Sequence, residues 1–350
     1  MADVKIGDRR VGDGEPCFVI AEIGINHNGE LATAKELVKA AAETGCDAVK
    51  FQKRTVEVVY TGEELGRPRE SPFGETNGDL KKGLEFGLNE YREIDEYCKS
   101  YGIIWFASCW DEGSVDFMRG FQPPCFKIAS ASLTDDALLR HHRKCGVPII
   151  LSTGMSTLEE IDHAVDLLGQ DDLVIMHCNS TYPATNEEIN LNTIQGLKQR
   201  YQVPVGYSGH ERGIAICSSA VVLGACVIER HFTFDRTMKG PDHASSVEPT
   251  GMADIVSRAK RFFVAMGNTE KRVLDCELKN RKKFRSDLGR LLQIKKSLKE
   301  NLRAWIYHPE SQWTDEFKMH IESKKHEWID FVLKVDAIAL PHQRKHAANE

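Results

Sequence analysis

The sequence predicts an α/β protein built on a closed barrel of eight parallel strands, followed by a helical C-terminal extension. Short apolar segments rich in β-branched residues alternate with longer segments of helical periodicity. Each helix must bring the chain back to begin a parallel strand, so the sheet is buried on both faces. Eight such units in about 250 residues match a (β/α)8 TIM barrel. The alternative, an open doubly wound sheet, usually carries a glycine fingerprint after its first strand, and the GINHNGE turn here lacks one.

The predicted elements follow one another in regular order. The strands are residues 17–24, 47–53, 103–109, 125–130, 148–153, 173–178, 204–208 and 226–232. The helices that separate and follow them are residues 31–45, 89–102, 111–120, 134–146, 157–170, 191–201, 213–224 and 252–267. The sequence thus divides into an N-terminal segment (1–16), a barrel domain (17–285), and a helical extension with a polar tail (286–350).

Two segments depart from this alternation. Residues 61–88 are polar and glycine-rich and follow the second strand, which predicts either a lid or specificity loop or a simple surface excursion. Beyond residue 270 the chain is basic and amphipathic, which predicts helices that pack on the barrel or on a partner subunit. Their large aromatic residues are too numerous to leave in water, and they favour a homodimer. These residues are Trp305, Trp313, Phe317, Trp328 and Phe331.

Composition excludes several classes of protein. The chain of 350 residues has 46 Lys and Arg against 52 Asp and Glu, a net charge of −6, which gives no general attraction to nucleic acid or anionic membrane. The basic run RKKFR is typical of a solvated helix face. No apolar stretch approaches the ~20 residues of a membrane span, and the polar N-terminus does not resemble a secretory signal. The ten cysteines form no CxxC pair, so we expect a reduced, cytoplasmic protein.

Polar side chains collect at the C-terminal ends of the predicted strands, where barrels of this type carry their active sites. Lys50 and Lys127 stand inside apolar strands, and a buried lysine is costly without an anionic partner. Each lysine either pairs with a structural carboxylate or shares an anionic ligand that carries phosphate or carboxylate.

Hydroxyl and imidazole groups accompany the two lysines. Four serines end strands, and each alone is typical of a helix N-cap, whereas together on one rim they favour a phosphate cradle. They are Ser108, Ser130, Ser152 and Ser208. His210 and His231 end successive strands and are either hydrogen-bonded core histidines or, with oxygen ligands, a site for an octahedral cation such as Mn²⁺. For His27 a local hydrogen bond in the NHNG turn is the favoured interpretation.

Nine ordered motifs between about residue 15 and about residue 285 resemble the N-acetylneuraminate (sialic acid) synthase family. They are AEIGINHNG, DAVKFQK, FASCWD, FKIAS, ILSTGM, HCNSTYP, GYSGHERG, ERHFT and GPDHASSVEP. The resemblance implies a (β/α)8 barrel that uses a divalent metal, Mn²⁺ first and Mg²⁺ or Co²⁺ as alternatives. It also implies two substrates, phosphoenolpyruvate and a neutral acylamino-hexose such as N-acetylmannosamine, which condense to a nine-carbon 2-keto acid with release of phosphate.

The resemblance also implies residue roles. The phosphoenolpyruvate site would comprise Lys50, Lys127, Ser108, Ser130, Ser152, Asn179 and Ser208. The metal ligands would be His210 and His231, and Glu22 would be the acidic residue next to the reacting centre. The sugar contacts would be Gln52, Tyr182 and Asp242, the last placed close to the chemistry with Glu22 and the lysines.

The sequence departs from the family at its C-terminal end. Family members usually continue into an antifreeze-like domain, which supplies the partner subunit's active site with an arginine that contacts the N-acyl group. Here the family-like stretch ends near ELKNRKKFR, and the helical segment that follows predicts no such domain. The acceptor sugar is therefore open. Two alternatives remain beside the proposed activity: a phosphoenolpyruvate-dependent synthase acting on another aldose, and a non-catalytic barrel that binds phosphorylated ligands.

Overall fold

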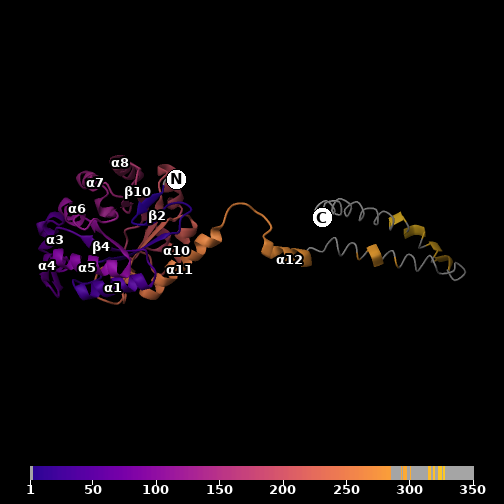
Figure 1. Ribbon diagram of the computed structural model, residues 1–350, viewed down its shortest axis with the longest axis horizontal. Coiled ribbons are helices and arrows are strands. Elements are labelled where there is room, and N and C mark those ends of the chain that lie inside the picture. Colours follow the sequence, from indigo (N-terminus) through magenta and orange to yellow (C-terminus); the bar gives the residue numbers. More distant parts are fainter. Residues whose placement is uncertain are drawn as a thin grey trace. The chain divides into compact units, whose positions relative to one another are not determined.

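The computed structural model confirms the predicted closed barrel (Figure 1). It describes residues 3–284 and, beyond them, residues 293, 295–297, 300, 314–316, 318–319, 322–324 and 326–327. The eight barrel strands pair in the order β10-β11-β12-β3-β4-β7-β8-β9, and every pairing is parallel. The strands are β3 (Phe18–Gly24), β4 (Ala48–Lys53), β7 (Ile104–Cys109), β8 (Phe126–Ile128), β9 (Ile149–Ser152), β10 (Leu173–Cys178), β11 (Val205–Gly209) and β12 (Val227–His231).

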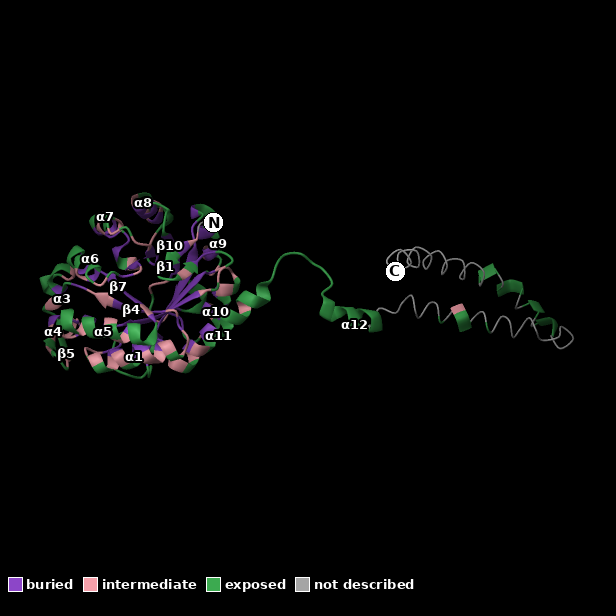
Figure 2. Ribbon diagram, in the orientation of Figure 1, coloured by how far each residue is buried: buried purple, intermediate pink, exposed green. Residues whose placement is uncertain are grey.

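Helices cover the outside of the barrel because their apolar stripes pack on the outer faces of the strands. The helices are α1 (Leu31–Glu43), α5 (Leu88–Tyr101), α6 (Glu112–Arg119), α7 (Asp136–Arg143), α8 (Leu158–Leu168), α9 (Thr193–Tyr201), α10 (Ala215–Val222) and α11 (Pro249–Met266). Figure 2 shows buried residues concentrated in the strands and exposed residues on the outward faces of the helices. The main apolar core lies between these two layers.

A short N-terminal hairpin closes the end of the barrel where the strands begin. Strands β1 (Val4–Ile6) and β2 (Arg9–Val11) pair antiparallel. Val4, Ile6 and Val11 are buried in a second apolar cluster with side chains from inside the barrel, such as Phe18 and Ile20. The sequence assigned no structure to residues 1–16. Because this end is filled with apolar side chains, a polar cavity can only open at the other end.

The segment after β4 is folded rather than irregular. It contains α2 (Val56–Val59), α3 (Gly62–Leu65), the hairpin β5 (Pro68–Ser71) and β6 (Gly74–Thr76), and α4 (Asn77–Gly83). The Phe73 ring lies so close to Gly83 that a Cβ atom there would be 2.1 Å from the ring. A capping box between Thr76 and Asp79 begins α4. The segment is thus an ordered part of the barrel's active face, and its function as a lid or specificity loop stays a prediction.

The chain falls into two compact units, Met1–Gly267 and Asn268–Glu350. The second unit includes α12 (Asp275–Phe284), which the sequence had assigned to the barrel domain. Most of the predicted extension 286–350 lies outside the described residues, and so do all five aromatic residues on which the predicted homodimer rests. Among the described residues, no helix is long and apolar enough to cross a membrane.

Candidate active site

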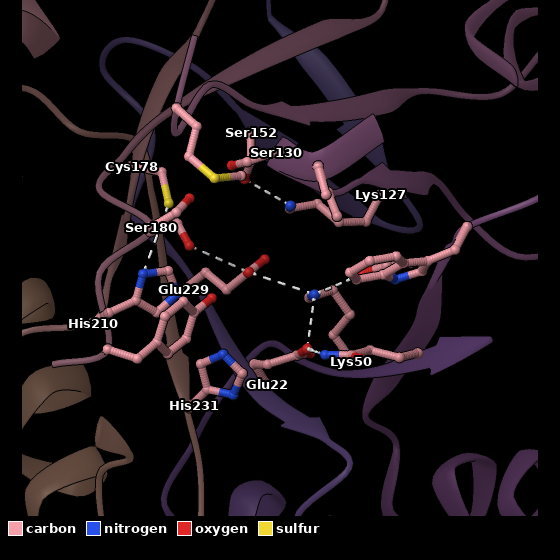
Figure 3. Close-up of a pocket in the computed structure, with 18 residues that line it drawn as sticks. Glu22, Lys50, Lys127, Ser130, Ser152, Cys178, Ser180, His210, Glu229 and His231 are labelled. Atoms are coloured by element: carbon pink, nitrogen blue, oxygen red, sulfur yellow. Dashed lines mark hydrogen bonds and ion pairs between the residues drawn. The ribbon is translucent and has the colours of Figure 1, made fainter. Parts of the chain in front are cut away.

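A polar cavity of about 220 Å³ opens at the carboxyl ends of the barrel strands (Figure 3). Its walls come from every one of the eight strands or the turns that follow them. Eleven of the residues that the sequence singled out line it: Glu22, Lys50, Gln52, Ser108, Lys127, Ser130, Ser152, Tyr182, Ser208, His210 and His231. These side chains converge because alternate residues of each strand face the barrel interior and all carboxyl ends meet at one rim.

Lys50 has carboxylate partners within the protein. Its Nζ lies 3.0 Å from Glu22 Oε1 and 3.5 Å from Glu229 Oε1, and it donates a hydrogen bond of 2.8 Å to Ser108 Oγ. Burial alone would lower the pKa of Lys50, but the two carboxylates outweigh it and raise that pKa above its ordinary value. Lys50 therefore has carboxylate partners, and they keep its ammonium group charged next to the cavity.

Lys127 has no such partner. Its Nζ donates to Ser152 Oγ at 2.7 Å and to Ile128 O at 3.2 Å, and no carboxylate among the described residues forms an ion pair with it. Its side chain is buried, and burial lowers the pKa of Lys127, with Glu229 offsetting the effect only in part. A buried ammonium group without a contacting carboxylate favours an anionic ligand at this position.

Two buried carboxylates face the same cavity from neighbouring strands but differ in environment. Burial raises the pKa of Glu22, although Lys50 and a hydrogen bond from Gln52 Nε2 (3.0 Å) oppose it. Burial would also raise the pKa of Glu229, but Lys127 and Lys50 outweigh it and hold that pKa below its ordinary value. One carboxyl group is therefore adapted to exchange a proton and the other to remain ionised.

The two histidines lie next to each other, with ring centroids 5.5 Å apart. Nδ1 of His210 lies 2.6 Å from Asn179 O, and because a carbonyl only accepts, this nitrogen carries the proton and leaves Nε2 free to act as a ligand. Burial, with a further contribution from His231, lowers the pKa of His210 to about 3, so its ring is neutral, as metal ligation requires. Nδ1 of His231 is buried without a hydrogen-bond partner and lies 3.7 Å from Asp242 Oδ2.

These residues fit a divalent cation. A metal–nitrogen bond of about 2.1 Å puts each ring centroid about 3 Å from the ion, so rings up to about 6 Å apart can share it. The second oxygens of Glu22 and Glu229 are also buried without partners. In the part of the chain that the structure describes, however, no group of three or more His, Cys, Asp or Glu side chains is arranged as a metal site. Ligands beyond His210 and His231 would come from water or substrate.

Two residues that the sequence singled out do not line the cavity. The side chain of Asn179 points away, donates to Glu188 O at 3.0 Å and accepts from the Thr181 amide at 2.8 Å. The next residue, Ser180, lines the cavity instead. Asp242 immediately precedes the short 3-10 helix η3 (His243–Ser245), and its Oδ2 lies 3.7 Å from His231 Nδ1, whereas it is absent from the cavity lining.

The structure adds residues to which the sequence assigned no role. They are Glu229, Ser180, Cys178 and Trp110. Glu229 precedes His231 by two positions in one strand, so strand alternation was a signal that both face the cavity. Ser180 approaches Ser130 across Gly154, where a Cβ atom would lie 2.3 Å from Ser180 Oγ. No sequence pattern indicated that approach.

His27 is a structural residue, as the sequence favoured. Its Nδ1 accepts a hydrogen bond of 3.1 Å from the Gly29 amide, and its ring stacks on Phe86 with centroids 4.1 Å apart. Burial lowers the pKa of His27 to about 3, so the ring is neutral. It shapes the turn after β3 and does not reach the cavity.

The comparisons with known proteins agree with this geometry. Residues 37–271 match the NeuB family. The chain is 38% identical to human N-acetylneuraminate-9-phosphate synthase over 77% of each chain. It is 39% identical to N,N'-diacetyllegionaminic acid synthase of Legionella pneumophila, over 76% of this chain and 78% of the relative. The crystal structure of N-acetylneuraminic acid (sialic acid) synthetase from Leptospira borgpetersenii, in complex with citrate, has a TM-score of 0.71 and 31% identity, covering 81% of this chain and 98% of that chain.

Fold and site thus define a (β/α)8 barrel enzyme whose cavity is lined by two lysines, two carboxylates and two histidines. The chain belongs to the NeuB family, and it is a transferase of the nonulosonic acid synthase type. The predicted family resemblance is confirmed.

Proposed function

We propose that this enzyme condenses phosphoenolpyruvate with an acylamino-hexose, similar to N-acetylmannosamine, to give a nine-carbon 2-keto sugar acid and inorganic phosphate. The observation that carries the proposal is Lys127, a buried lysine without a contacting carboxylate, in a small cavity rich in hydroxyl groups. Phosphoenolpyruvate carries both a phosphate and a carboxylate, so it would supply the missing negative charge. Relatives named for N-acetylneuraminate-9-phosphate and diacetyllegionaminic acid support this class of product.

Charged and uncharged side chains of the cavity would make different contacts with phosphoenolpyruvate. Lys127 and Lys50 would hold the anionic groups, and the hydroxyls of Ser130, Ser152 and Ser180 would donate to phosphate oxygens. Ser108 and Ser208, on the flanking strands β7 and β11, would orient the rest of the molecule. Because the lysines are fixed by hydrogen bonds before a ligand arrives, little reorganisation is needed on binding.

The metal would be held by His210 and His231, with Mn²⁺ the best match to two neutral imidazoles and oxygen ligands. When bound, it would supply Lewis-acid polarisation of the aldehyde of the open-chain sugar. The Tyr182 ring lies against that of His210, tilted by 31° with ring centroids 4.0 Å apart, and would bound the sugar site with Gln52. Asp242 would orient His231 from behind, which differs from the direct sugar contact that the sequence predicted.

The proton chemistry would fall to Glu22. In the proposed reaction the methylene carbon of phosphoenolpyruvate bonds to the aldehyde carbon of the sugar as the C=O π bond of the aldehyde breaks. The former aldehyde oxygen takes up a proton and becomes a hydroxyl, and positive charge develops at C2. Water adds to C2, and Glu22, whose raised pKa suits proton exchange, accepts a proton from it. Glu229 stays ionised and stabilises the developing charge. The tetrahedral intermediate then expels phosphate by cleavage of the C–O bond, which leaves the 2-keto acid.

The test is phosphate release from phosphoenolpyruvate and Mn²⁺ with a panel of acceptors: N-acetylmannosamine, its 6-phosphate, mannose, a 2,4-diacetamido sugar, arabinose 5-phosphate and no sugar. Release with one acylamino sugar, lost with EDTA and in His210→Ala, supports the proposal and names the acceptor. Phosphate release with arabinose 5-phosphate alone would instead indicate that the acceptor is a different aldose. Phosphoenolpyruvate binding without release in any sample would support the non-catalytic alternative.

A further inference from the structure

A buried ion pair lies directly next to both candidate metal ligands in the sequence. Glu211 follows His210, and Arg230 precedes His231. The Arg230 and Glu211 side chains are 1% and 0% exposed, and Nη1 of Arg230 lies 2.8 Å from Glu211 Oε1. Neither residue lines the cavity. The pair therefore does not bind substrate, and the proposed mechanism does not use it.

Strand alternation places this pair on the outer side of the barrel wall. His231 faces the cavity, so Arg230, the preceding residue of β12, faces the opposite way, toward α10. Arg230 also donates to Gly213 O at 2.8 Å and to Glu211 O at 2.5 Å. A single side chain of β12 thus holds both the carboxylate and the backbone of the turn that carries His210.

Other contacts, from β11 itself and on the same outer side of the barrel wall, fix Glu211. The Tyr207 hydroxyl donates to Glu211 Oε2 at 2.8 Å. A Cβ atom at Gly209 would lie 2.4 Å from the same oxygen, so the carboxylate folds back over a position that tolerates only glycine. Glu211 also forms an isolated parallel β-bridge with Ala184, and the Ala184 amide donates a hydrogen bond of 3.2 Å to His210 O.

Stability does not account for such a pair. Removing an arginine and a carboxylate from water costs several kcal/mol each, and apolar residues of similar volume are often at least as stabilising. The fork of the guanidinium group, by contrast, fixes direction as well as distance. Here the ion pair fixes the distance between the ends of the neighbouring strands β11 and β12, where His210 and His231 lie.

We propose that Arg230 and Glu211 are positioning residues that set His210 against His231 and thereby set the affinity of the enzyme for its divalent cation. This inference rests on the proposed metal site. The pair acts on the cation through the histidines and has no direct effect on the phosphoenolpyruvate subsite, whose lysines lie on β4 and β8.

The experiment compares Mn²⁺ affinity with phosphoenolpyruvate affinity in the same folded variants. Variant one carries Arg230→Met and Glu211→Leu, an apolar pair of similar volume; variant two carries Tyr207→Phe, which removes only the hydroxyl on Glu211. The matched control is Lys198→Met, which removes a buried lysine paired with Asp13 at the other end of the barrel. Free Mn²⁺ is measured by electron paramagnetic resonance, and metal-free phosphoenolpyruvate binding by calorimetry.

We expect the apolar pair to raise the Kd for Mn²⁺ about 10- to 100-fold, the range for residues that orient metal ligands. Tyr207→Phe should raise it less, and in both variants the phosphoenolpyruvate Kd should match wild type. Lys198→Met should leave both constants unchanged. A wild-type Mn²⁺ Kd in the folded apolar variant, or in Tyr207→Phe if the apolar variant does not fold, would overturn the inference. An equal loss of affinity for Mn²⁺ and for phosphoenolpyruvate would also overturn the inference, because it would indicate that the whole cavity had become less rigid. Absence of Mn²⁺ binding to wild type would refute the proposed metal site itself.

Discussion

Replacing Lys127 by methionine should separate ligand binding from stability. Nζ of Lys127 uses two of its three protons on Ser152 Oγ and Ile128 O, which leaves one for a ligand. A hydrogen bond to a charged group contributes about 1.5–3 kcal/mol, so Lys127→Met should raise the Kd for phosphoenolpyruvate about 10- to 150-fold. The buried ammonium has no contacting carboxylate, so its loss should not lower the free energy of unfolding.

The pH dependence of stability gives a second measure of the same residue. Burial holds the pKa of Lys127 below its ordinary value of 10.5, so between these two values the unfolded chain binds more protons there than the folded chain. The contribution of Lys127 to the free energy of unfolding therefore rises with pH across that window, and Lys127→Met removes this contribution. The free energy of unfolding of Lys127→Met should exceed that of wild type most below the lowered pKa of Lys127, and the difference should decrease toward pH 10.5.

The assays are calorimetric titration with phosphoenolpyruvate and urea unfolding at several pH values. Lys198→Met is the matched control, because Lys198 is also buried but pairs with Asp13. It should lower stability and leave phosphoenolpyruvate binding unchanged. An unchanged phosphoenolpyruvate Kd in Lys127→Met, or a stability loss as large as in the control, would refute the assignment of Lys127 to the anion site.

Four further substitutions test the proton chemistry, the phosphate site and the packing inside the barrel. Glu22→Gln should lower kcat by about 10²- to 10⁴-fold while phosphoenolpyruvate still binds, as steady-state and binding assays would show; a normal kcat would remove Glu22 from the proton chemistry. Ser180→Ala should weaken phosphoenolpyruvate binding by about 10- to 150-fold, the loss of one hydrogen bond to a charged phosphate group, whereas Asn179→Ala should not; the reverse order in titrations would restore the sequence-based assignment. Gly206→Ala should lower the free energy of unfolding by about 1–3 kcal/mol, because its Cβ atom would lie 2.4 Å from Met176 Sδ inside the barrel; equal urea midpoints would contradict this.

The sequence predicted the barrel well because each strand is buried on both faces and therefore reads as an uninterrupted apolar run. Polar residues within such runs, such as Lys50 and Lys127, stood out for the same reason. The N-terminal hairpin was missed because strands of three residues carry too little periodicity to identify. The apolar side chains of these two strands pack into the end of the barrel interior, and only the assembled barrel shows that this space exists.

The sequence-based assignments and the lining of the cavity differ where strands end. Alternation separates the two faces of a strand, but it fails in the turn that follows, so Asn179 was selected and Ser180 was not. Asp242 was read as a sugar contact, whereas the structure places it against His231. Which carboxylate accompanies Lys50 depends on the order of strands around the barrel, and closure brings Glu22 and Glu229 together from neighbouring strands β3 and β12.

The mass of the product decides whether the enzyme joins the two proposed substrates. The purified full-length chain is incubated with Mn²⁺, N-acetylmannosamine and phosphoenolpyruvate that carries ¹³C at all three carbons. We expect a product that contains the whole sugar and all three labelled carbons but no phosphorus. It should form in equal amount with inorganic phosphate. Labelled carbon that appears only as pyruvate, with the sugar unchanged, would contradict it.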